Sequence, residues 1–138
     1  MSALSILLAD DHLLVRQGLR RILEEQREWT VSEAGDGRAA VALALAHPPQ
    51  VAILDIVMPG LNGIDAARQI ARRLPGTHLM MLSMHAREEY VIQAVQAGVK
   101  GYVLKDSADV DLVQAVQAVA ADKSYFSPAV ASIMLTDY

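Results

Sequence analysis

Cysteine is absent from the 138-residue sequence, which excludes disulfide bonds and thiolate metal ligands. Long apolar runs are absent too, because stretches such as Val41–Ala46 (VALALA) are far shorter than the roughly 20 residues of a membrane-spanning helix. The N-terminus lacks the basic and then apolar segments of a secretory leader. These absences predict a soluble, cytoplasmic protein without membrane contact.

Positive charge is scarce, with 12 Lys and Arg against 16 Asp and Glu and a formal net charge of −4. Surfaces that neutralise nucleic-acid phosphates need clustered Lys and Arg, so this chain is not expected to bind DNA by itself. Its length fits one domain that buries roughly two thirds of the surface of the unfolded chain.

What the sequence does contain is an alternation of two kinds of segment. Five apolar or β-rich runs predict strands at Leu4–Ala9, Trp29–Ala34, Val51–Leu54, His78–Ser83 and Gly101–Leu104. Helical patterns lie between and after them, from about His12 (with Val15, Leu19, Ile22 and Leu23 on one face) and over Arg38–His47, Ile64–Arg73, Glu88–Ala97 and Val110–Ala121. Such alternation predicts an α/β domain with a doubly wound parallel sheet.

The domain is predicted to span residues 1–122. Residues 123–138 are expected to be a C-terminal tail or the start of a linker. Within them, Ser127 can cap and Pro128 can open a short helix.

Polar residues follow the predicted strands, where open α/β sheets bind their ligands. They are Asp10, Asp11, Asp55, Ser83 and Lys105. Each has an ordinary alternative, which the sequence leaves open. Asp10 or Asp11 could cap the following helix, Asp55 could start a turn, and Ser83 and Lys105 could be plain strand-end residues.

Taken together, these residues favour phosphoryl-transfer chemistry. Three carboxylates that converge repel one another unless a cation lies between them. The four histidines lack metal-ligand spacing, so oxygen ligands alone favour a hard ion such as Mg²⁺. The Lys105 ammonium and the Ser83 hydroxyl suit phosphoryl oxygens, which leaves Asp55 as the nucleophile.

Four motifs occur in order, each at the end of a predicted strand: LLADDH, ILDIVMPGLNG, LMMLSMH and GYVLKD. Over residues 4–121 they resemble the bacterial response-regulator receiver domain, and LSMH, GYVLKD and YFSP are most similar to the NarL/FixJ (LuxR-type) subgroup. The resemblance implies a flavodoxin-like fold, with five helices and five parallel strands in the order 2-1-3-4-5.

The resemblance also implies site roles. Asp55 would accept a phosphoryl group from a phosphohistidine of a sensor histidine kinase. Asp11 would bind Mg²⁺ directly and Asp10 largely through water, while Asp55 and the backbone carbonyl of Val57 would supply further ligands.

The same resemblance assigns the residues around the phosphoryl group. Lys105 and Ser83 would contact its oxygens, and Ser83 and Tyr102 would form the conformational switch. Tyr102 could instead be a half-buried strand aromatic. Asp106 stands where many receivers have proline, which leaves the isomer of the preceding peptide open. Met84 is bulkier than the usual Ala or Gly and could narrow the access to Asp55.

By the same resemblance, the output is a changed protein surface and not an enzymatic reaction. NarL/FixJ members usually control transcription through a helix-turn-helix domain, which these 138 residues do not contain, and phosphorylation is expected to produce a homodimer. A stand-alone receiver that acts by protein–protein interaction is the alternative. A phosphohydrolase is disfavoured because Val57 stands where such enzymes carry an acid. A receiver that has lost phosphorylation is a third reading.

Overall fold

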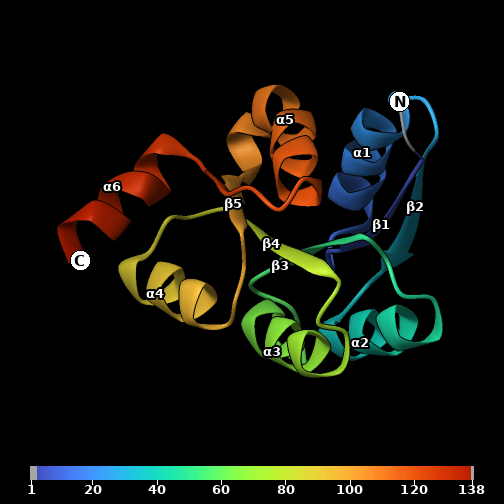
Figure 1. The fold of residues 1–138 in the computed structure, drawn as a ribbon, viewed down its shortest axis with the longest axis horizontal. Helices are drawn as coiled ribbons and strands as arrows, with labels where there is room; N and C mark the ends of the chain where they lie inside the picture. The colour runs from blue at the N-terminus through green and yellow to red at the C-terminus, as the bar shows by residue number, and fades with distance from the viewer. Residues whose placement is uncertain (1–2, 138) are drawn as a thin grey trace.

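The computed structural model describes residues 3–137, which form one parallel sheet with helices on both faces (Figure 1). The sheet order is β2-β1-β3-β4-β5-β6. The strands are β1 (Leu4–Ala9), β2 (Trp29–Ala34), β3 (Val51–Asp55), β4 (His78–Ser83), β5 (Gly101–Leu104) and β6 (Tyr125–Phe126). The helices are α1 (Leu13–Glu24), α2 (Gly37–Ala46), α3 (Gly63–Arg73), α4 (Glu88–Gln96), α5 (Ala108–Ala120) and α6 (Pro128–Asp137).

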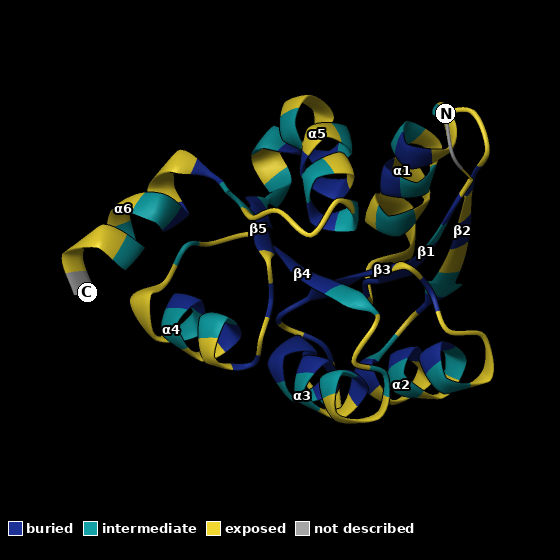
Figure 2. Ribbon diagram, viewed as in Figure 1, coloured by how far each residue is buried: buried dark blue, intermediate teal, exposed yellow. Residues whose placement is uncertain are grey.

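The helices divide between the two faces of the sheet. Helices α1 and α5 cover one face, and α2, α3 and α4 cover the other (Figure 1). Each face has its own apolar cluster, in which Leu23 and Leu112 represent the first layer and Ile70 and Val91 the second. The central strands β1, β3, β4 and β5 are buried between them, as their mostly dark blue colour shows (Figure 2), because continuous apolar runs suit strands covered on both faces.

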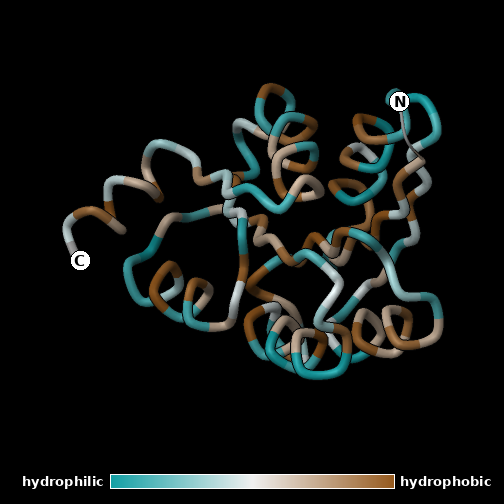
Figure 3. The backbone as a smooth tube through the Cα atoms, viewed as in Figure 1, coloured by the Kyte–Doolittle hydropathy of each residue, from teal (hydrophilic) through white to brown (hydrophobic). Residues whose placement is uncertain are grey.

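Hydropathy follows the same division. The strands at the centre are mostly hydrophobic, whereas hydrophilic residues gather in the loops (Figure 3). Over residues 3–137, every helix falls short of the length and apolar content that crossing a bilayer would demand.

The predicted fold class is confirmed, with the five predicted strands in the predicted order and the five predicted helices in place. Most bounds move by only one or two residues, and α1 begins at Leu13. Val15 was predicted on the apolar face of this helix, but it is 41% exposed. The buried residues of α1 are Leu19 and Leu23.

Two elements extend the predicted sheet. β6 adds a sixth strand beside β5, and α6 lies next to α4. Ser127 stands directly before α6 as predicted, but its buried hydroxyl makes no hydrogen bond among the described residues, so the predicted side-chain cap is wrong. Its backbone N–H instead donates to the carbonyl of Tyr102 at 3.0 Å. The domain boundary at residue 122 stays a prediction.

Local signals place the loop that follows β3. Asn62 caps α3 by accepting a hydrogen bond from the N–H of Asp65 at 2.9 Å. The next residue is Gly63, at which a Cβ atom would collide with the backbone carbonyl of Asp55. This close approach requires glycine, and it brings the start of α3 directly against the residue that ends β3.

Candidate functional site: an acidic cluster with a buried lysine

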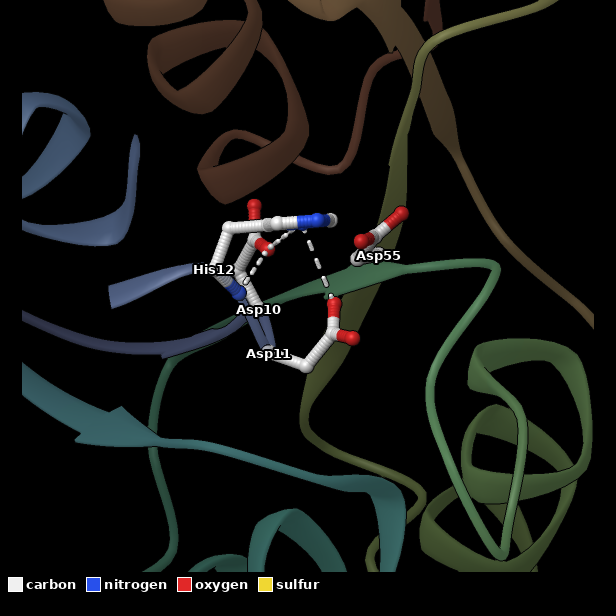
Figure 4. Close-up of side chains that lie close together, drawn as sticks. All are labelled: Asp10, Asp11, His12 and Asp55. Carbon is white, nitrogen blue, oxygen red and sulfur yellow. Dashed lines mark hydrogen bonds and ion pairs between the residues drawn. The ribbon is translucent and has the colours of Figure 1, made fainter. Parts of the chain in front are cut away.

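The site begins where β1 and β3 end side by side. The two strands pair in parallel, with Ala9 opposite Leu54, so the residues that follow emerge at the same edge of the sheet. There the side chains of Asp10, Asp11 and Asp55, together with His12, each offer a ligand atom within 4.8 Å of the others (Figure 4). The structure thus brings the three predicted carboxylates together.

Lys105 joins this cluster from the end of β5. Its Nζ atom donates to Oδ2 of Asp55 at 3.0 Å and lies 2.8 Å from Oδ2 of Asp10. The lysine side chain is only 8% exposed, so little solvent screens these ion pairs. A pocket of about 260 Å³ opens in front of them, and its lining includes Asp11, Val57 and Ser83.

Asp10 is the most deeply buried carboxylate of the cluster. Its Oδ1 accepts a hydrogen bond from the N–H of His12 at 2.9 Å, and the residue is fully buried. Its Oδ2 has Lys105 as a charge partner, but that contact lacks hydrogen-bond geometry. Helix α1 has His12 at its N-cap position and no side-chain cap. The capping alternative for Asp10 and Asp11 is therefore wrong.

The ionisation of Asp55 reflects two opposing effects. Burial raises the pKa of its carboxyl group and outweighs the lowering by the Lys105 ammonium and the backbone N–H of Val57. Burial also works against the charge of Lys105, but the carboxylates of Asp10 and Asp55 outweigh it and raise the pKa of the ammonium. Lys105 thus stays charged at neutral pH.

Ser83 and Tyr102 both contact the backbone of His85 in the loop after β4. The Oγ of Ser83 accepts a hydrogen bond from the N–H of His85 at 3.3 Å, and the hydroxyl of Tyr102 donates to the carbonyl of His85 at 2.9 Å. Tyr102 is fully buried, not half-buried, and burial raises its pKa to about 12. Its hydroxyl therefore remains a donor throughout the physiological range.

The two sequence departures have definite structures. The peptide between Lys105 and Asp106 is trans, as are all the peptide bonds of the described residues. Met84 is 62% exposed and lines the pocket. Val57 also lines it and is 62% exposed.

His12 lies at the site and Arg16 lies beside it, and the sequence predicted a site role for neither. His12 was expected to be a surface or packing residue and not a metal ligand; its Nδ1 lies 3.5 Å from Oδ1 of Asp10 and 3.3 Å from Oδ1 of Asp11. Arg16 reaches back from α1 and donates to the backbone carbonyl of Asp10 at 2.6 Å. The spacing of Arg16 gave a usable signal, because helical side chains point toward the N-terminus and cover the preceding turn.

Comparisons with known proteins give one consistent result. Residues 6–117 match the family model described as the response regulator receiver domain. The uncharacterized transcriptional regulatory protein YxjL of Bacillus subtilis (strain 168) is 39% identical over 96% of this chain and 61% of its own length. The transcriptional regulatory protein DegU of Brevibacillus brevis is 36% identical over 98% of this chain and 58% of its own length.

A solved structure shows the same likeness. The two-component response regulator of the LuxR family from Aurantimonas sp. SI85-9A1 superposes with a TM-score of 0.93, at 34% identity. The match covers 99% of this chain and 98% of that one. In contrast, this chain spans only about 60% of the length of the two curated relatives.

Proposed function

Because this chain belongs to the response regulator receiver family, in its NarL/FixJ (LuxR-type) group, we propose that Asp55 accepts a phosphoryl group from a sensor histidine kinase. Receiver domains are phosphoacceptors and not conventional enzymes. The observation that carries the proposal is the meeting of Asp10, Asp11 and Asp55 with the buried ammonium of Lys105. A structural ion pair would need one carboxylate for Lys105, whereas two contact it and a third, that of Asp11, lies in the same cluster.

The residues present fit Mg²⁺ in two respects. The donors are carboxylate oxygens, which hard divalent cations prefer, and the buried Oδ2 of Asp10 lacks a hydrogen bond. We assign Asp11 and Asp55 as direct ligands, Asp10 as a ligand largely through water, and the carbonyl of Val57 as a further one. When bound, Mg²⁺ supplies positive charge that offsets the phosphoryl oxygens.

The chain's own groups account for the transfer. A carboxylate oxygen of Asp55 attacks phosphorus, the bond from phosphorus to the kinase imidazole breaks, and the imidazole nitrogen keeps the electron pair. Lys105 already contacts Asp55 and stabilises the charge on the transferred group, since such transition states need positioning and electrostatic stabilisation more than covalent help. Ser83 lines the same pocket and offers its hydroxyl to another phosphoryl oxygen.

The switch is proposed to run through Ser83 and Tyr102. Both residues bond to His85 in the loop that precedes α4, so a movement of Ser83 toward a phosphoryl group changes the surroundings of the tyrosine hydroxyl. The changed position of the tyrosine would alter the packing of α4 and β5, and also that of α6, which contacts α4. Phosphorylation can shift this equilibrium only by its differential affinity for the two states.

The output is proposed to be transcriptional control through a DNA-binding domain in a longer protein. Both curated relatives are named transcriptional regulatory proteins and are longer than this chain. We also propose a homodimer on phosphorylation, supported by Leu14 on α1 and Val110 on α5, which are 83% and 69% exposed. The coding sequence beyond Tyr138 tests the first proposal, and sedimentation with and without phosphorylation tests the second.

Incubation with acetyl phosphate and Mg²⁺, followed by intact-mass measurement, tests the central proposal. We expect one added phosphoryl group, which disappears in Asp55→Asn and when the metal is chelated. Rapid release of phosphate without accumulation would instead indicate a phosphohydrolase. No modification under any of these conditions would indicate a receiver that acts without phosphorylation.

A further inference from the structure

Arg16 lies outside the carboxylate cluster but contacts the acidic loop, which is formed by Asp10 and Asp11. It lies in the first turns of α1, and its side chain is only 15% exposed. Its Nη1 donates to the backbone carbonyl of Asp10 at 2.6 Å, while its Nε donates to Oε1 of Glu33 at 2.7 Å. One guanidinium therefore joins the end of β1 to the end of β2.

Glu33 is itself held in place. It lies in β2 opposite Leu8, and its second oxygen accepts a hydrogen bond from Nη1 of Arg20 at 2.6 Å. The hydrogen bonds from Arg20 and Arg16 keep the pKa of Glu33 below its ordinary value, so the carboxylate stays ionised at neutral pH. The Arg16 side chain thus has a fixed anchor of opposite charge.

The Arg16–Glu33 pair holds Asp10, the residue that directly follows β1 and begins the acidic loop. The N–H of Asp10 donates to the carbonyl of Ala34 at 3.1 Å, and its own carbonyl accepts from Arg16. The backbone of Asp10 is thereby held on both sides. Its carboxylate must point into the cluster, and Asp11 must follow at the pocket wall.

The anchor also solves an electrostatic problem. An arginine free to move beside three carboxylates would pair with them and compete with a bound cation. Glu33 engages the Nε edge of the guanidinium. Within residues 3–137, the hydrogen bonds and ion pairs of Arg16 are with Glu33 and the backbone carbonyl of Asp10, not with the cluster carboxylates. The pair therefore supplies rigidity to the site without adding a competing charge.

We propose that Arg16, anchored by Glu33, is a positioning residue that sets the cation affinity of the Asp10–Asp11 loop. This inference rests on the cation site of the proposed function, and it assigns a role to two residues outside that site. Supporting residues that orient metal ligands typically change affinity by about 10- to 100-fold when they are removed.

The test measures binding of Mn²⁺ alone, from the electron paramagnetic resonance signal of the free ion. We expect the dissociation constant of Arg16→Ala to rise about tenfold, and that of Glu33→Ala to rise in the same direction. Arg20→Ala is the matched control, because it removes a neighbouring hydrogen bond to Glu33 and leaves the Arg16 contact with Asp10 intact. Because Arg20 also helps to hold Glu33, the dissociation constant of Arg20→Ala should rise, but clearly less than that of Arg16→Ala.

A second readout separates positioning from general damage to the fold. In phosphorylation by acetyl phosphate, Arg16→Ala should need about tenfold more Mg²⁺ for half-maximal rate, while its rate at saturating Mg²⁺ stays within about threefold of wild type. Wild-type affinity in both Arg16→Ala and Glu33→Ala, or an equal loss in Arg20→Ala, would overturn the inference. Failure of the wild-type chain to bind Mn²⁺ would overturn the proposed function as well.

Discussion

Tyr102 connects three parts of the molecule through its own atoms. Its hydroxyl bonds to the carbonyl of His85 beside the pocket, and its backbone carbonyl accepts from the N–H of Ser127, which begins the α6 segment. The ring is fully buried in the cluster that also contains Val91 and Val130. A single strand residue therefore links the pocket loop, α4 and α6.

Removal of the Tyr102 hydroxyl should have a measurable cost. Tyr102→Phe keeps the ring but loses the bond to His85, so we expect the free energy of unfolding to fall by about 1 kcal/mol in urea titrations. Tyr90→Phe is the control, because the Tyr90 hydroxyl makes no hydrogen bond within residues 3–137, and it should change the free energy by less than about 0.5 kcal/mol. Equal effects of the two substitutions would contradict this account.

The C-terminal elements are held at the edge of the sheet by both backbone and side-chain contacts. β6 pairs with β5, with Tyr125 opposite Gly101 and Phe126 opposite Tyr102. The hydroxyl of Tyr125 donates to Oδ1 of Asp111 on α5 at 3.1 Å. On α6, Val130 is completely buried in the cluster shared with α4. These contacts pack β6 and α6 against the sheet edge and α4.

Two substitutions on α6 test its docking. Val130→Ala removes two buried methyl groups and leaves a cavity, so we expect the free energy of unfolding to fall by about 2 kcal/mol. Leu135→Ala, on the same helix but 83% exposed, should change it by less than about 0.5 kcal/mol. Thermal or urea unfolding measures both. If Val130→Ala were as mild as Leu135→Ala, α6 would not be packed on the domain in solution.

At the scale of the whole molecule, the ionised carboxylate of Asp55 opposes the stability of the fold. Asp55 has a folded-state pKa above its ordinary value of 3.8, because burial disfavours the ionised form. This penalty is absent below the pKa of the unfolded state, grows as pH rises through the folded pKa, and is complete above it. Folding thus places a charged group where folding alone would favour a neutral one.

Asp55→Asn should accordingly unfold less readily than wild type at pH 7 without divalent metal. Lys105 keeps its contact with Asp10 in this variant, so no buried cation is left without a partner. The difference should shrink as pH falls toward the ordinary pKa of 3.8, below which Asp55 is protonated in both states. Urea titrations at several pH values measure it, and a constant difference between pH 7 and pH 4 would contradict the burial argument.

Divalent metal should make the wild-type protein more stable than Asp55→Asn, which reverses the order expected without metal. A ligand that binds only the folded state stabilises it by about 2.7 kcal/mol at 100 times its dissociation constant. Mg²⁺ at that level should raise the unfolding free energy of wild type by this amount, and that of Asp55→Asn by less. An equal gain in both would show that Asp55 does not take part in metal binding.

The amino-acid sequence by itself determined the alternation of strands and helices and the strand-end positions of the five polar residues. Apolar runs and helical spacing are local signals, and parallel strands bring their carboxyl ends to one edge. The sequence also indicated a helix at Pro128. It gave no sign of β6, because a two-residue strand has no periodicity of its own and forms only beside β5.

Tertiary structure alone decided how neighbouring residues differ. Asp10 and Asp11 are adjacent and chemically identical, yet Asp10 is fully buried and Asp11 reaches the pocket wall. Adjacent residues of an extended segment face opposite ways, and the pairing of β1 with β2, which continues to the N–H of Asp10, decides that Asp10 and not Asp11 faces inward. Pairing between strands distant in sequence sets these directions, and the order of residues along the chain does not encode them locally.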